Sequence, residues 1–154
     1  RASANMVFSS VQGGMMGALG IGLPDVPIFL AAVFKTLFEI SLSFGYPYDT
    51  KQEQTYQMLL ICAAVGEEAE RKQAAVDANI VAQQIRMGAG ICSVSFEEAK
   101  QRASKALCSA ALMGKMVQGA PIIGVYGGFR NGVLLKQIGT VAAVKYQQRM
   151  LRER

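Results

Sequence analysis

The chain has 154 residues, of which 51% are hydrophobic, and a formal net charge of +5. This length suits one domain that buries its own core without disulfides or metals, and we expect a single domain over residues 1–154. Histidine is absent, which excludes Ser-His-Asp and Cys-His nucleophile systems and most zinc sites. We therefore expect no metal and no cofactor.

The three cysteines, Cys62, Cys92 and Cys108, form no CxxC pair and lie among apolar or small residues. They are expected to be free thiols on buried helix faces in a reducing compartment, which favours a cytoplasmic protein. The first ten residues lack the continuous apolar core of a signal peptide. Because the chain begins with Arg and not Met, we expect it to be a fragment of something longer.

Residues 11–34 are almost wholly apolar. The glycines and methionines of residues 11–22 either pack closely against another backbone or form a loose helix, because glycine costs about 1 kcal/mol relative to alanine in a helix. A simple membrane crossing needs about 20 predominantly apolar residues, and here prolines and glycines interrupt the stretch. A straight transmembrane helix is therefore not expected, although a re-entrant hairpin is compatible with the composition.

The first complete helix is expected from about Pro27 to Ser43, after Pro24 and with Asp25 as a candidate N-cap. Its two charges, Lys35 and Glu39, are four residues apart and share one face. All other faces are apolar, which predicts a helix that is buried on most sides.

Three further helices are predicted by capping signals and apolar stripes. A capping box at Thr50, in which Glu53 reaches back to the cap, begins a helix over residues 51–65. A surface helix follows over residues 67–87, and a second capping box at Ser95 begins a helix that ends near residue 118 and has small residues along one side. The residues expected on the buried stripe of the first of these helices are Tyr56, Leu59, Leu60 and Ala63.

Residues 121–132 carry a glycine at every fourth position, a spacing that lets a second backbone lie close. These glycines are Gly124, Gly128 and Gly132. Arg130 and Asn131 would be costly in lipid, so we favour core packing over membrane dimerisation. A final amphipathic, basic helix is expected over residues 133–152. Its expected apolar residues are Leu135, Ile138, Ala142, Tyr146 and Met150. With no alternating strand pattern, the predicted fold is all-α, a compact bundle of about six helices with Gly-rich close packing.

Two groups of short motifs lie towards the two ends of the chain. They are Gly22-Leu23-Pro24-Asp25-Val26-Pro27, Phe29, Lys35-Thr36, Glu39-Ile40 and Gly45-Tyr46, and later Pro121, Gly124, Gly128, Asn131 and the tail Tyr146-Gln147-Gln148-Arg149. Together they resemble the EcsC protein family, with Val26 in place of the usual Ile, Lys35 in place of Arg, and a looser tail. The resemblance implies a bacterial helical protein that lacks part of the usual N-terminal region. It also implies a membrane-linked context, since the founding member is encoded beside an ABC transporter, and it supplies no reaction.

Four polar residues are candidates for function because they lie in apolar stretches, where an unpaired charge is expensive. They are Asp25, Lys35, Glu39 and Asn131. We favour structural roles for them: Asp25 caps a helix, Lys35 pairs with Glu39, and Asn131 satisfies backbone groups.

The basic residues of the last helix are candidates for contact with an anionic membrane surface or partner. These residues are Lys145, Arg149 and Arg152. The alternative is that they only complement the helix dipole at its C-terminus. Nucleic acid is not expected as a partner, because the chain has no interleaved aromatic residues, no Gly-rich phosphate loop and no zinc-finger spacing.

We favour a non-enzymatic helical module that associates peripherally with the inner face of the cell membrane, or with a membrane protein such as an ABC transporter. One alternative is a lipid or small-molecule pocket between the Gly-rich helices. Its expected lining residues are Met15, Met16, Met113 and Met116. Another is a hydrolase that uses Asp25 and Glu39 as a carboxylate pair.

Overall fold

A computed structural model describes the backbone of residues 25–118 and 123–154 and the side chains of residues 27–111 and 132–154. These ranges contain helices only. The helices are α2 (Asp25–Ser43), α3 (Lys51–Val65), α4 (Glu68–Arg86), α5 (Phe96–Gln118) and α6 (Ile123–Arg152). The all-α prediction is confirmed, whereas six helices are not, since the described ranges hold five.

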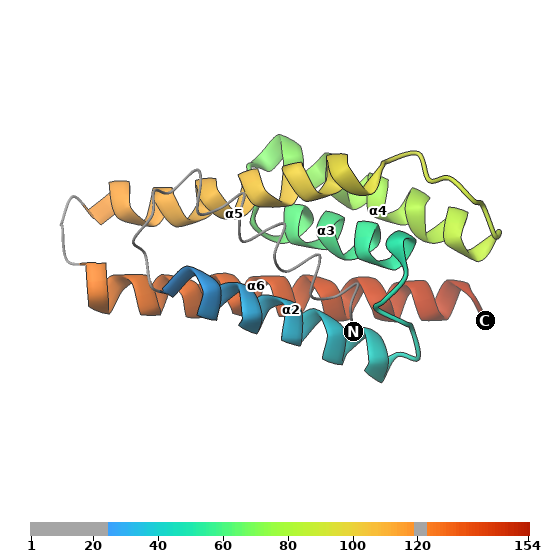
Figure 1. Cartoon of the computed structure of the whole chain (residues 1–154), viewed down its shortest axis with the longest axis horizontal. Coiled ribbons are helices and arrows are strands. Elements are labelled where there is room, and N and C mark those ends of the chain that lie inside the picture. Colours follow the sequence, from blue (N-terminus) through green and yellow to red (C-terminus); the bar gives the residue numbers. More distant parts are fainter. Residues whose placement is uncertain (1–24, 119–122) are drawn as a thin grey trace.

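Successive helices run in alternating directions, so that α2 and α6 lie side by side and point the same way (Figure 1). Helix α3 packs against α4, α5 and α6, and α2 packs mainly against α6. The buried apolar residues of all five helices form one hydrophobic cluster. In the part of the chain that the structure describes, no helix combines the length and apolarity that a membrane crossing needs.

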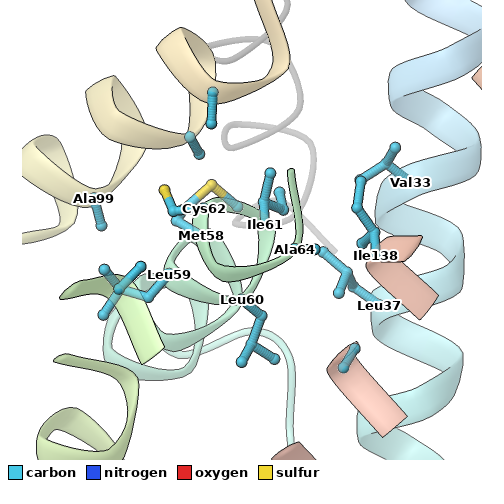
Figure 2. Packing of buried hydrophobic residues seen from close by; sticks show 14 of the residues in the cluster. Val33, Leu37, Met58, Leu59, Leu60, Ile61, Cys62, Ala64, Ala99 and Ile138 are labelled. Carbon is cyan, nitrogen blue, oxygen red and sulfur yellow. The ribbon is translucent and has the colours of Figure 1, made fainter. Parts of the chain in front are cut away.

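Helix α3 is the centre of the bundle, and eleven of its fifteen residues are buried. Its apolar side chains point in all directions, towards α2, α5 and α6 (Figure 2). The backbone N–H of Glu53 donates to Oγ1 of Thr50 at 3.1 Å, as the capping signal predicted. The helix ends at Gly66, where a Cβ would lie 2.6 Å from the carbonyl oxygen of Cys62, so only glycine fits.

Burial on most sides was predicted for α2 and is wrong for that helix. Its inner face, which includes Val33 and Leu37, packs next to Ile138 of α6 (Figure 2). Its outer face is exposed. That face consists of Ile28, Ala31, Lys35, Glu39 and Leu42. Among the described helices, α2 lies at the edge of the bundle and packs mainly against α6, so one side of it has helical neighbours.

Helix α6 contains both the glycine repeat and the final basic helix, which were predicted as separate elements. Glycine lowers helix propensity by only about 1 kcal/mol per residue, and here it does not interrupt the helix. A Cβ on Gly132 would meet nothing within 4 Å, and one on Gly139 would make ordinary contact with Thr36 at 3.5 Å. Gly-rich close packing is therefore not confirmed, and the side-chain surroundings of Gly124 and Gly128 lie outside the described residues.

The apolar side of α6 agrees with the prediction at its centre, where Ile138, Ala142 and Tyr146 are fully buried. At its end the stripe continues with Arg149, which is also buried. A charged residue at a core position requires a partner, because an isolated buried charge is very costly.

Candidate functional site

Arg149 of α6 forms a buried ion pair with Glu53 of α3. Its Nη1 and Nη2 atoms donate to the two carboxylate oxygens of Glu53 at 2.8 and 2.7 Å, and the two side chains are 5% and 2% exposed. The Nε atom donates to Glu153 at 3.2 Å. This two-pronged geometry is the strongest form of arginine–carboxylate contact.

Aromatic rings enclose the guanidinium group of Arg149. Its Cζ atom lies 4.1 Å from the ring centroid of Tyr46 and 4.9 Å from that of Tyr56. The Tyr46 hydroxyl donates to Glu153 at 2.6 Å. We call these five residues, Tyr46, Glu53, Tyr56, Arg149 and Glu153, the Arg149 cluster. It joins the segment after α2 to α3 and to the end of α6.

The Arg149 cluster shifts the acid–base properties of its members. Burial, together with the hydrogen bond to Glu153, raises the pKa of Tyr46 to about 12. Burial alone would lower the pKa of Arg149, but its hydrogen bonds to Glu53 outweigh this effect and raise that pKa above its usual value. The cluster therefore keeps a neutral phenol and a charged guanidinium at all physiological pH values.

A groove of about 340 Å³ lies beside the Arg149 cluster, between α4 and α6. Helices α4 and α6 both pack against α3, but they make little direct contact with each other. We call this space the basic groove. Its lining residues are Tyr56, Asn79, Ile80, Ala82, Gln83, Arg86, Lys145, Arg149, Arg152 and Glu153.

The basic groove has more positive than negative charge. Arg86, Lys145 and Arg152 form no ion pair with any residue of described side chain. Four cations line the groove, against Glu153 in the lining and Glu53 directly beneath Arg149. Four positive and two negative charges leave an excess of two positive charges.

Among the residues of described side chain, Lys145 contacts neutral groups alone. Its Nζ atom donates to the carbonyl oxygen of Ala75 at 3.4 Å and to Oδ1 of Asn79 at 3.2 Å. Burial, and to a smaller degree the charge of Arg152, lowers the pKa of Lys145. The groove thus holds a half-buried ammonium group without a carboxylate partner, which is an arrangement that favours an incoming anion.

The groove opens near the end of the bundle where large apolar side chains are exposed. Met87 and Ile91, in the connection between α4 and α5, and Leu151 of α6 are all exposed. That connection and the C-terminus lie at the same end of the molecule (Figure 1). Nη1 of Arg86 donates to the backbone carbonyl of Arg152 at 3.1 Å, which ties the two helix ends together.

The candidate residues of the first helix do not gather in a site. Lys35 pairs with Glu39 at 3.8 Å on the exposed face of α2, as we favoured. Asp25 is the first residue of that helix, so fourteen residues, or about 21 Å of helix, separate it from Glu39. In glycoside hydrolases, for example, the two catalytic carboxylates lie roughly 5–9.5 Å apart. This pair therefore cannot act as proposed for a hydrolase.

The remaining candidates fall into two groups. Asn131 belongs to α6, but its side chain and the four methionines of the expected pocket lie outside the described residues. Lys145, Arg149 and Arg152 all line the basic groove. Contact with an anionic membrane or partner stays a prediction for these residues, but Arg149 is 5% exposed because Glu53 and the tyrosine rings bury it.

Sequence reasoning missed Glu53, Tyr46 and Arg86 as site residues. Glu53 was assigned to a capping box, whereas its carboxylate binds Arg149. The sequence did contain a signal that Glu53 faces the core. Glu53 precedes Tyr56 and Leu60 by three and seven residues, so all three side chains lie on one face of the helix. Nothing in the sequence around Arg86 indicated a role in a site, since its place in the groove depends on how α4 and α6 are arranged in space.

The described side chains include no group of three or more Cys, Asp or Glu residues that could hold a metal ion. The three cysteines are free thiols. Cys62 is buried as expected, and burial raises its pKa to about 12, whereas Cys92 lies in the connection between α4 and α5.

The chain matches the model of the EcsC protein family over residues 1–151. Neither curated proteins nor solved structures give a match. The family match includes residues 67–94, which the short motifs left uncovered. Two of those motifs meet in space, because Tyr46 of the first group contacts Arg149 of the tail.

Proposed function

Since the chain belongs to the EcsC protein family, we propose that it is a non-enzymatic helical module that associates peripherally with an anionic membrane surface. One observation carries this proposal. Cations that pair with no described carboxylate occur together with exposed apolar side chains at one end of the bundle. The cations are Arg86, Lys145 and Arg152, and the apolar residues are Met87, Ile91 and Leu151.

The two kinds of side chain contribute to membrane binding in different ways. Each Lys or Arg near an anionic surface contributes about 1 kcal/mol, and this attraction weakens as salt screens it. Three groove cations therefore contribute roughly 3 kcal/mol at low ionic strength. Apolar side chains that enter the boundary between headgroups and acyl chains add a contribution that salt does not weaken. Because stable anchoring generally takes two signals, we expect firm association only when both contributions act together.

Co-sedimentation with vesicles tests the proposal. The chain is mixed with phosphatidylcholine vesicles, or with vesicles that also contain phosphatidylglycerol, at low and at high salt. We expect binding to the anionic vesicles alone, with an affinity that falls as salt rises. The variant Arg86→Gln/Lys145→Gln/Arg152→Gln should lose most of this binding, and Met87→Ser/Ile91→Ser/Leu151→Ser should lose the part that resists salt.

A charge-matched triple variant and a single apolar variant serve as controls. Arg71→Gln/Lys105→Gln/Lys136→Gln removes the same charge from exposed positions outside the groove, and Ile28→Ser removes an exposed apolar residue from the start of α2. Both should bind as the unmodified chain does. The proposal fails if the chain does not bind anionic vesicles at low salt, or if the control and groove triple variants lose binding equally. Failure to bind would favour a protein partner.

A further inference from the structure

We infer that the basic groove is a binding site for a phosphate monoester group, with Lys145, Arg86 and Arg152 as the cations that recognise it. This inference deepens the proposed function, because it names the headgroup chemistry that the groove would select on a membrane. A soluble phosphate monoester carries the same group, and the experiment below separates the two sources.

Charge is the first reason. The groove has an excess of two positive charges, as counted from its lining residues and Glu53. A phosphate monoester carries about −1.5 to −2 at pH 7, because its second pKa is near 6. Carboxylates and phosphate diesters carry a single negative charge. A monoester is therefore the common biological group whose charge matches that of the groove.

Free hydrogen-bond donors are the second reason. The ammonium group of Lys145 has three N–H donors, and two of them are directed to Ala75 and Asn79. One donor remains for a ligand in the groove. The guanidinium of Arg152 donates to no described residue, and only Nη1 of Arg86 is engaged, by the carbonyl oxygen of Arg152. These donors suit the three terminal oxygens of a phosphate monoester.

The Arg149 cluster supplies the rigid side of the site. Arg149 and Tyr56 line the groove while Glu53 and Glu153 hold the guanidinium of Arg149. Because Arg149 is already paired with two carboxylates, it fixes the shape of the groove and does not bind the ligand. Lys145, on the same helix, is available to bind the phosphate. A binding group held by packed neighbours loses little entropy when a ligand arrives.

Size is consistent with a small group and not with an extended chain. The groove volume of about 340 Å³ is near the lower end of the usual range for ligand pockets, about 300–1,000 Å³. It accommodates a phosphate with a short polyol such as glycerol. Ile80 in the wall and the Tyr56 ring offer apolar surface beside the charged donors.

Titration calorimetry of the full chain with glycerol 3-phosphate tests the inference, with glycerophosphoglycerol, a diester of single negative charge, as the control. We expect glycerol 3-phosphate to bind at least tenfold more tightly than the diester and to raise Tm at saturation. Lys145→Gln and the exposed-position variant Arg152→Gln should each weaken binding about tenfold, while Lys136→Gln on the same helix should not. The inference is overturned if monoester and diester bind equally, or if both groove variants bind as the unmodified chain does.

Vesicles identify the source of the monoester. Phosphatidic acid, a monoester lipid, is compared with phosphatidylglycerol, a diester lipid, at equal surface charge. A lipid source predicts tighter binding to phosphatidic acid vesicles than to soluble glycerol 3-phosphate, whereas a soluble source predicts the reverse. Equal binding to both vesicles together with no monoester preference in solution refutes the inference and leaves the proposed function intact. Binding of soluble monoester without any vesicle binding refutes the proposed function alone.

Discussion

Breaking the buried pair between Arg149 and Glu53 should destabilise the fold strongly. Among the described side chains, Glu53→Gln leaves the guanidinium with Glu153 as its one charged partner. Arg149→Met removes the one cation that pairs with the Glu53 carboxylate, which is 2% exposed. Removing one member of a buried ion pair costs about 3–5 kcal/mol. For a chain of this length, this corresponds to a fall in Tm of roughly 6–20 °C.

The free energy of unfolding is measured by urea denaturation followed by circular dichroism, for both single variants and for Glu53→Met/Arg149→Met. The double variant leaves neither Glu53 nor Arg149 as a buried unpaired charge, and Glu153, which loses Arg149, is 24% exposed. It should therefore lose at least about 2 kcal/mol less than the sum of the single losses, within the range seen for residues in contact. A control is the exposed pair of Lys35 and Glu39, with side chains 75% and 67% exposed. Glu39→Gln should cost at most about 0.5 kcal/mol.

Two results would refute this reasoning. One is a cost below about 1 kcal/mol for Glu53→Gln, which would mean that the buried carboxylate contributes no more than a surface one. The other is additivity of the two single variants, which would mean that Glu53 and Arg149 do not interact in solution.

Two further predictions concern titratable groups. The raised pKa of Tyr46, about 12, means that the native state favours the neutral phenol; the stability this provides is complete below pH 10 and is lost as pH rises through about 12. Spectrophotometric titration of Tyr46→Phe should show one fewer late-ionising phenol than the unmodified chain. Urea denaturation at several pH values should show that this variant loses less stability between pH 10 and 12. An unchanged titration curve or an unchanged pH dependence of stability would contradict the prediction. Cys62 is fully buried with a raised pKa, so iodoacetamide should modify it only when the chain unfolds, and Cys62→Ala should remove this late label. Rapid native labelling of Cys62, detected by mass spectrometry, would contradict its burial.

Local signals in the sequence predicted individual helices well. The bounds of α3 agree with the prediction, and both Thr50 and Ser95 accept the capping hydrogen bonds expected of them. Helix α4 differs from its predicted range by one residue at each end. Such signals succeed because caps and apolar periodicity involve residues three or four apart, whose relation is fixed once the helix forms.

The sequence did not reveal which helix is central. Apolar composition predicted burial on most sides for α2, but α3 is the central helix, although it carries Glu53, Gln54 and Gln57 on its buried surface. Polar residues enter a core when distant residues satisfy them, as Arg149 does for Glu53 across 96 positions. No periodicity within one helix reveals such a partner.

By itself, the sequence determined the helical class, the capping of the middle helices, the absence of histidine chemistry and the motifs that resemble one family. Tertiary structure alone decided which charges are buried and which are available. Arg149 and Arg152 are three residues apart on one basic helix, yet Arg149 is enclosed by α3 and the tyrosine rings, while Arg152 stays exposed at the groove. The physical reason is that the cost and use of a charge depend on its neighbours in space, and these neighbours come from helices far apart in the chain.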